Sequence, residues 1–355
     1  MRWEGLQVSE DRAVLELPLG LAHATVRTFD TPGFRGITCY EIRAKSIINK
    51  VPGASRVPFQ WTINPYRGCS HACTYCFARN THTYLDLDAG HDFDSRIVVK
   101  VNAGQLLRKE LAAPRWAGEH IAMGTNVDCY QRAEGRYRLM PQIIEALRDH
   151  ANPFSILTKG TLILRDLELL RQAADVTKVG LAMSIGFVDE RLWRSVEPGT
   201  PSPRRRLDAV RTLSDAGLDV GVLMAPILPG ITDGPEELDR TVAAIAAAGA
   251  ASVTPLPLHL RPGAREWYLR WLSRTRPDLL ERYRELYRGG SYALSGYQRE
   301  VTARVRLAAH RHGLARAPAG QARAVTDGPA EAGPEAHDQG RTDRKEDQAT
   351  QLTLL

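Results

Sequence analysis

Three cysteines stand within eight residues of the chain, as Cys69, Cys73 and Cys76. In a chain that stays in the cytosol, cysteines clustered in this way indicate a metal or redox site rather than disulfides. A structural zinc site takes four ligands, whereas an iron–sulfur cube held by three cysteines leaves one iron open to an external ligand. The spacing C-x3-C-x2-C therefore predicts an iron–sulfur site with an open position. A zinc site completed by Cys39, Cys129 or a histidine is the alternative.

The composition is that of an ordinary soluble protein. The chain has 355 residues, of which 43% are hydrophobic and 25% are charged. The N-terminal segment lacks a basic region followed by an apolar run, and no apolar stretch reaches the roughly 18 residues that a membrane span needs. We therefore expect a cytoplasmic protein.

Six short apolar runs alternate with longer helical patterns along the middle of the chain. Continuous apolar runs fit strands that are buried on both faces, and their alternation with helices predicts parallel βα units. Six such units predict an α/β fold with a partial (β/α)6 TIM-type barrel, in which ligands bind at the carboxyl-terminal ends of the strands. A doubly wound open sheet is the competing topology. The runs are residues 61–65, 120–124, 154–158, 179–185, 220–225 and 252–258.

The regions outside the barrel differ from it in composition. Residues 1–58 have β-prone stretches between Gly and Pro breaks and are predicted to be an irregular N-terminal extension, with the barrel over residues 59–260. Residues 261–316 form a basic, helical C-terminal region. Residues 317–355 lose the apolar periodicity and contain no aromatic residue, so this tail is predicted to be disordered.

The positive charge is concentrated in the C-terminal region. Residues 261–316 contain thirteen Arg and only five Asp or Glu, which indicates a phosphate-rich partner or an Arg-rich solvated surface. Trp267 and Trp271 are four residues apart, as are Tyr283 and Tyr287, so each pair shares a helix face. These faces either pack against the barrel or stack on bases.

The segment around the cysteines resembles the radical S-adenosylmethionine (SAM) enzymes. The carrying residues are NPYRGCSHACTYCFAR, residues 64–79, with the aromatic Tyr75 directly before the last cysteine. The segment is similar in particular to the branch typified by spore photoproduct lyase, and the resemblance covers residues 61–258. It implies a partial (β/α)6 barrel in which Cys69, Cys73 and Cys76 bind a [4Fe–4S] cluster. It also implies that SAM binds the open iron and is cleaved reductively to a 5′-deoxyadenosyl radical, which abstracts a hydrogen atom.

The resemblance also implies cofactor-binding residues at the ends of the strands. MGTNVDCYQ, residues 123–131, resembles the family's second-strand motif near the methionyl amine of SAM, and a polar residue on the fourth strand contacts the ribose or carboxylate. Lys159 stands at the end of the third strand and is a candidate to bind a carboxylate or a substrate phosphate. The expected SAM contacts are Tyr75, Gly124, Thr125, Asn126, Asp128 and Ser184.

Cys129 departs from the proline that the family resemblance leads us to expect in this motif. A thiol at the end of a strand is a candidate hydrogen-atom donor, because lesion-reversing relatives use a cysteine in that role. A partly buried, inert cysteine is the alternative.

These observations predict a radical SAM enzyme that acts on nucleic acid, in repair or processing of damaged DNA, and that receives its electron from a reducing donor. The alternatives are a radical SAM enzyme that modifies a protein or small molecule, and a non-catalytic iron–sulfur or zinc protein.

The final residues, QLTLL (residues 351–355), are similar to the short peptides by which bacterial repair proteins dock on the DNA sliding clamp. The clamp is therefore a further candidate partner.

Overall fold

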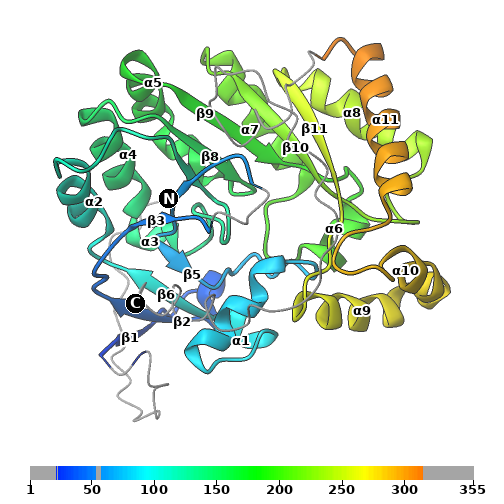
Figure 1. The fold of residues 1–355 in the computed structure, drawn as a ribbon, viewed down its shortest axis with the longest axis horizontal. Coiled ribbons are helices and arrows are strands. Elements are labelled where there is room, and N and C mark those ends of the chain that lie inside the picture. Colours follow the sequence, from blue (N-terminus) through cyan, green and yellow to red (C-terminus); the bar gives the residue numbers. More distant parts are fainter. Residues whose placement is uncertain (1–20, 22, 53–56, 315–355) are drawn as a thin grey trace.

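A single open sheet of seven strands forms the centre of the molecule (Figure 1). The computed structural model describes residue 21 and residues 23–52 and 57–314. Six strands are parallel, and β3 adds antiparallel to β4 at one edge. Within the described residues β11 and β3 do not pair, so the sheet stays open. In sheet order the strands are β11 (Ser252–Pro257), β10 (Val220–Ile227), β9 (Val179–Ser184), β8 (Phe154–Thr158), β7 (Ile121–Met123), β4 (Trp61–Ile63) and β3 (Ile48–Lys50).

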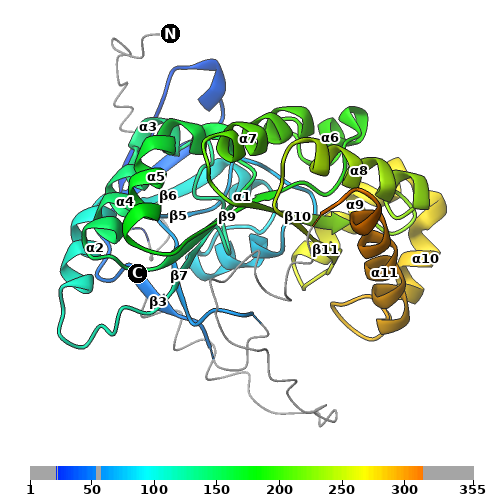
Figure 2. The same ribbon diagram turned by 90° about the horizontal axis from the view of Figure 1, so that it is seen from above.

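The six parallel strands coincide with the six apolar runs in the sequence, and the predicted α/β architecture of parallel βα units is confirmed. The parallel strands are largely apolar and mostly buried, and Figure 2 shows helices along one face of the sheet. Helix α7 begins after Ser202, whose hydroxyl accepts the N–H of Arg205, and ends before Gly217, which has a φ of +84°. The helices between the strands are α2 (Ala103–Leu111), α3 (Glu134–Tyr137), α4 (Leu139–Asp149), α5 (Leu167–Val176), α6 (Glu190–Val196), α7 (Pro203–Asp215) and α8 (Pro235–Ala247).

A second, four-stranded sheet stands where the sequence predicted an irregular extension. Its order is β1 (Thr25–Thr28), β2 (Thr38–Ile42), β6 (Arg96–Lys100) and β5 (Tyr66–Arg67). Strand β2 pairs in parallel with β6, and β5 pairs antiparallel with β6 just before the cysteines. The described part of the extension therefore forms regular strands, because β6 supplies a partner from a distant part of the chain. Helix α1 (His91–Ser95) leads into β6.

The C-terminal region is helical, as predicted, and packs on the sheet. It contains α9 (Ala264–Thr275), α10 (Leu280–Leu286) and α11 (Ser295–Arg311), and α11 lies beside α8 and β11 in Figure 1. Tyr283 and Tyr287 are buried, and the indole of Trp271 donates to the hydroxyl of Ser195 at 2.8 Å. The interpretation that these aromatic residues pack against the barrel is confirmed.

Two predictions concern segments that the structure does not describe. The tail of residues 317–355 and its final QLTLL lie outside the described residues. The domain boundaries after residues 58, 260 and 316 stay predictions.

In the part of the chain that is described, no helix is long and apolar enough to span a membrane.

Candidate active site

The three cysteines lie after β4 and β5, at the carboxyl-terminal end of the parallel strands. Gly68, directly before them, has a φ of +81°, and a Cβ atom there would lie 2.8 Å from Cε1 of His82 and 2.9 Å from the carbonyl oxygen of Arg96. Gln131 is fully buried, accepts the N–H of Ser70 at 2.9 Å and donates to the carbonyl of Gly68 at 2.8 Å. The entry to the cysteine loop (residues 68–79) is therefore fixed from both sides.

Arg79, three residues after the last cysteine, holds the cysteine loop in place through its buried guanidinium. Its guanidinium is fully buried and donates to the carbonyl oxygens of Cys73 at 2.9 Å and Gly90 at 2.8 Å. It also pairs with Asp94 at 2.9 Å and stacks on Trp267, with 4.8 Å to the ring centroid. A buried arginine engaged on all sides is a rigid support, because moving it would leave an unpaired charge in the interior.

The segment after β9 clamps the middle of the loop. The N–H of Thr74 donates to the carbonyl of Val196 at 2.9 Å, and the N–H of Gly199 donates to the carbonyl of His71 at 3.0 Å. A Cβ atom at Gly199 would lie 2.0 Å from the carbonyl oxygen of Ser70, so only glycine permits this approach. The loop is thus tied to the region after the fourth parallel strand.

The three thiols fit the donor set of an iron–sulfur cluster. Cys69 and Cys73 are buried and Cys76 is partly buried, and burial raises the pKa of each thiol. Binding iron would keep the thiolates deprotonated in this apolar setting. Within the described residues, no three His, Cys, Asp or Glu side chains converge tightly enough to hold a single ion. Three soft ligands on one loop suit a cluster, which distributes its ligands over several irons.

Asp128 connects the cysteine loop to the end of β8. Its carboxylate accepts the hydroxyl of Thr158 at 2.6 Å, the N–H of Lys159 at 2.6 Å and the N–H of Tyr130 at 2.9 Å. Nδ1 of His71 lies 3.4 Å from the same carboxylate. Burial alone would raise the pKa of Asp128, but His71 and these hydrogen bonds lower it to about 2. The ionised carboxylate of Asp128 therefore connects the cysteine loop to the residues at the end of β8.

Lys159 brings several predicted residues together at the ends of β8 and β9. Its ammonium donates to the hydroxyl of Ser184 at 2.6 Å and lies 4.0 Å from the carboxylate of Glu197. It also lies 5.8 Å from the ring centroid of Tyr75. Glu197 in turn accepts hydrogen bonds from the hydroxyl of Tyr75 and the guanidinium of Arg206. Tyr75, Ser184 and the cysteine loop therefore meet around one lysine.

This buried network fixes the charge of its members. Burial would raise the pKa of Glu197, but Arg206 and Lys159 hold it below its usual value. Burial, together with the charge of Glu197, raises the pKa of Tyr75 well above its usual range. At neutral pH the carboxylate is therefore ionised and the tyrosine stays protonated, as a donor to that carboxylate.

The residues after β7 line the same edge of the sheet. Gly124 has a φ of +75°, and a Cβ atom there would lie 1.8 Å from the carbonyl oxygen of Leu157. Glycine is therefore required at this position, because β8 passes too close for any side chain. Thr125 is half-buried and Asn126 is exposed, so both side chains remain accessible at the rim.

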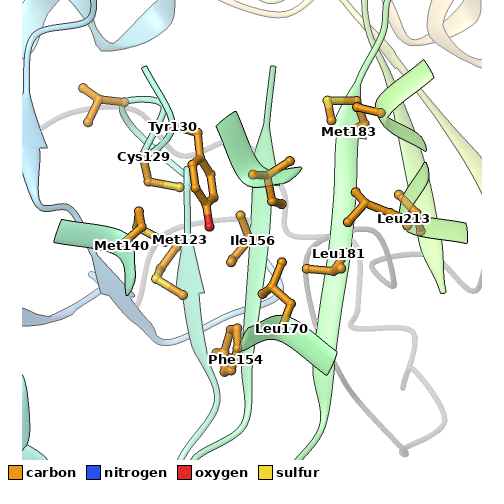
Figure 3. Packing of buried hydrophobic residues seen from close by; sticks show 14 of the residues in the cluster. Met123, Cys129, Tyr130, Met140, Phe154, Ile156, Leu170, Leu181, Met183 and Leu213 are labelled. Carbon is orange, nitrogen blue, oxygen red and sulfur yellow. The ribbon is translucent and has the colours of Figure 1, made fainter. Parts of the chain in front are cut away.

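The two remaining cysteines, Cys39 and Cys129, are fully buried. Cys129 is fully buried in the main core, where Figure 3 shows it beside Tyr130 and near Met140. Burial raises its pKa well above the usual range. Cys39 is also fully buried, with its thiol next to Tyr137, and burial raises its pKa to about 12. Both thiols are enclosed by the core, and a hydrogen-atom donor role for Cys129 stays a prediction.

Sequence reasoning found the loop but missed the groups that hold it. Gln131 ends the motif in which neighbouring residues were predicted as ligands, so its place in that motif was an available signal. Glu197 and Arg206 carry no sequence signature of their own. Their burial becomes visible only once the segment after β9 is packed against the cysteine loop.

Fold and loop together define an α/β protein with a three-cysteine site at the carboxyl-terminal edge of an open parallel sheet. The family model "Radical SAM superfamily" matches residues 63–242. The chain belongs to this superfamily and is a radical SAM enzyme, and the family implies SAM and a [4Fe–4S] cluster as cofactors.

Relatives extend over most of the chain. An uncharacterized protein of Mycobacterium tuberculosis is 52% identical over 280 residues, which are 79% of this chain and 82% of the relative. An uncharacterized protein of Methanocaldococcus jannaschii is 32% identical over 199 residues, which are 56% of this chain and 70% of that protein.

Solved structures show the same fold at low sequence identity. Spore photoproduct lyase complexed with dinucleoside spore photoproduct matches with a TM-score of 0.58 and 18% identity, over 77% of this chain and 79% of that chain. A mutant of the same lyase with bound AdoMet and dinucleoside spore photoproduct matches with a TM-score of 0.58 and 18% identity, over 77% of this chain and 78% of that chain.

Proposed function

We propose that this radical SAM enzyme acts on nucleic acid, in the repair or processing of damaged DNA. The observation that carries the proposal is a set of exposed arginines in the C-terminal region. Within the described residues no carboxylate pairs with these side chains, so they remain available to phosphates. They are Arg261, Arg270, Arg274, Arg288, Arg299 and Arg306.

The comparison with spore photoproduct lyase supports the same substrate class. That lyase shares the fold of this chain and is complexed with dinucleoside spore photoproduct in a solved structure. A bound cluster and SAM would supply hydrogen-atom abstraction from the substrate. The chain's own residues would bind, orient and exclude water around that chemistry.

In this proposal Cys69, Cys73 and Cys76 each bind one iron of the cluster. Lys159, with Ser184 beside it, offers a cation to the carboxylate of SAM. The remaining SAM contacts are proposed to be Tyr75, Gly124, Thr125, Asn126 and Asp128. Because the carboxylate of Asp128 already accepts bonds from three residues, its contribution would be to shape the site. The buried thiol of Cys129 is left out of the proposed mechanism.

The test is a SAM-cleavage assay with the anaerobically reconstituted enzyme and dithionite. The yield of 5′-deoxyadenosine is measured with UV-irradiated DNA, with intact DNA and with no substrate. We expect one of the DNA samples to stimulate the yield. Equal yields in all three samples would contradict a nucleic-acid substrate and favour the alternative, a protein or small-molecule substrate. Failure to form any 5′-deoxyadenosine would indicate a non-catalytic protein.

DNA binding can be tested through single arginines. Truncation after residue 260 is unsuitable, because Tyr268 and Tyr283 are buried and removing them would expose core. Arg274→Ala and Arg299→Ala should instead weaken DNA binding similarly for all sequences and lower its salt dependence. A binding constant that does not change with salt would contradict phosphate contacts.

We also propose the DNA sliding clamp as a partner for residues 351–355. The support is the sequence QLTLL alone. A peptide of the last ten residues should bind the purified clamp, and no binding at high micromolar concentration would contradict this partner.

A further inference from the structure

A row of aromatic rings leads outward from the cysteine loop. Phe77, which follows Cys76 directly, lies with its ring centroid 5.3 Å from the ring of His259. His259 stacks on Tyr292, with 5.7 Å between centroids and 26° between planes. The row therefore connects a residue adjacent to the proposed cluster with a residue of the C-terminal region.

Tyr292 ends this row at the surface. Among the described residues, the exposed large hydrophobic side chains are Val176, Leu307 and Tyr292, and Tyr292 is the aromatic one, at 46% exposure. Of the two aromatic pairs that the sequence offered for base stacking, Tyr283 and Tyr287 are buried, and Trp267 and Trp271 are partly buried. An exposed aromatic ring beside a reaction site points to a ligand with a flat apolar face.

The segment that carries Tyr292 is held firmly. Tyr292 forms an antiparallel β-bridge with His259, and the N–H of Leu260 donates to the carbonyl of Ser291 at 2.7 Å. The guanidinium of Arg265 donates to the carbonyl of Tyr287 at 3.1 Å. The exposed ring is thus presented by a rigid backbone, so that little ordering entropy is lost when a ligand stacks on it.

Positive charge lies next to the row. The exposed Arg261 places its guanidinium 5.3 Å from the ring centroid of Phe77. Arg270, also exposed, lies 5.6 Å from the ring centroid of Trp267, which supports Arg79 beneath the cysteine loop. Aromatic rings combined with arginines suit a base and its phosphate, since every base has a π-face and guanidinium binds phosphate oxygens through two N–H groups.

We infer that Tyr292 is a stacking platform for an unpaired nucleobase and that Arg261 contacts the phosphate beside that base. The inference rests on the proposed nucleic-acid function and makes it specific. A paired base hides its faces inside the duplex, so the platform requires a base that is unpaired or turned out of the stack. This requirement agrees with the proposed chemistry, because an atom inside a duplex would have to leave it to approach a cluster held by the buried thiols of Cys69 and Cys73.

The test uses the reconstituted holoenzyme and a single-stranded oligonucleotide with one central 2-aminopurine, whose fluorescence is quenched by stacking. Wild-type enzyme should bind and quench it. Tyr292→Ala should lose the quenching and weaken binding about tenfold or more, whereas Tyr292→Phe should retain both. Arg261→Ala should weaken binding and reduce the salt slope by about 1.

Matched controls come from α11. Arg304→Ala removes an exposed arginine that pairs with Glu300 and lies outside the proposed phosphate-binding set, and Leu307→Ala removes an exposed apolar side chain, so both should leave the quenching unchanged. Equal binding and quenching by wild type and Tyr292→Ala would overturn the platform while leaving the nucleic-acid function standing. An oligonucleotide that does not bind the wild-type enzyme at all would overturn the proposed function itself.

Discussion

The two ends of the parallel sheet are closed by different kinds of side chain. At the carboxyl-terminal end, charged groups are buried in pairs, as with Arg206 and Glu197 at 1% and 0% exposure. At the amino-terminal end, the neutral amide of Asn152 accepts the indole N–H of Trp116 at 2.7 Å and donates to the carbonyl of Glu119 at 3.0 Å. Both examples pair buried polar groups, but the first does so with full charges and the second with a neutral amide.

The amino-terminal end shows that this sheet can be closed without charges. Burying an ion pair costs several kcal/mol of desolvation, which a hydrophobic or neutral replacement avoids. The charges around Lys159 therefore need a reason other than stability, and the proposed binding of SAM among them would supply one. On this proposal the carboxyl-terminal end is the functional end of the sheet, and the amino-terminal end is a structural one.

The largest effect is expected from the cysteine loop. Replacing Cys69, Cys73 or Cys76 with Ala should remove the cluster and reduce SAM cleavage to background, because each would supply one iron ligand. Cys39→Ala is the matched control, since that thiol is buried beside Tyr137, and it should keep both properties. Iron and sulfide content and 5′-deoxyadenosine yield measure the outcome. A loop variant that retains full iron content would contradict the assignment.

The second effect concerns buried charge at the functional end. Arg206→Leu should destabilise the protein by about 3 kcal/mol or more, because it leaves the buried carboxylate of Glu197 without its main partner. Arg211→Leu, on the same helix but exposed and paired with Asp208, should change the free energy of unfolding by less than about 0.5 kcal/mol. Urea unfolding of the two variants measures both. Equal costs would show that the Arg206–Glu197 pair behaves like a surface pair.

The strands of the sheet could be predicted from sequence because each is a local signal. A continuous apolar run such as residues 154–158 identifies a buried parallel strand without knowledge of its neighbours. The small sheet could not be predicted in this way. Strand β2 pairs Thr38 with Arg96, so its regularity depends on a segment far away in the sequence.

The site likewise has parts that the sequence predicts and parts that it does not. The spacing of the cysteines is local and identified the loop, whereas the supporting charges depend on packing. After Pro203, helix α7 has three consecutive arginines, of which only Arg206 is buried, while Arg204 and Arg205 are exposed. Composition cannot distinguish the three, because the difference lies in which one faces Glu197.

The third prediction compares two buried amides. Gln131→Ala and Asn152→Ala should each destabilise the protein by about 2 kcal/mol. The first leaves the buried N–H of Ser70 and carbonyl of Gly68 without a partner, and the second does the same to the indole of Trp116 and the carbonyl of Glu119. Only Gln131→Ala should also lower the iron content, since Gln131 holds Ser70 and Gly68 at the entry to the cysteine loop. A loss of iron in both variants would mean that the two ends are not separable.

The smallest effect concerns pH at the structural end. Burial lowers the pKa of His120 from 6.5 to about 4, and its Nε2 is buried without a hydrogen-bond partner among the described residues. Between these values the unfolded chain binds a proton that the folded protein does not, so stability falls as the pH falls from 6.5 towards 4.

His120→Leu keeps the apolar volume and removes this titration. Because the ring is only partly buried, we expect the wild type to lose about 1 kcal/mol more than the variant between pH 6.5 and pH 5. Urea unfolding at the two pH values measures the difference. If the wild type and His120→Leu lose the same stability between the two pH values, then His120 is hydrated in the folded protein. Water would then reach the amino-terminal end of the sheet.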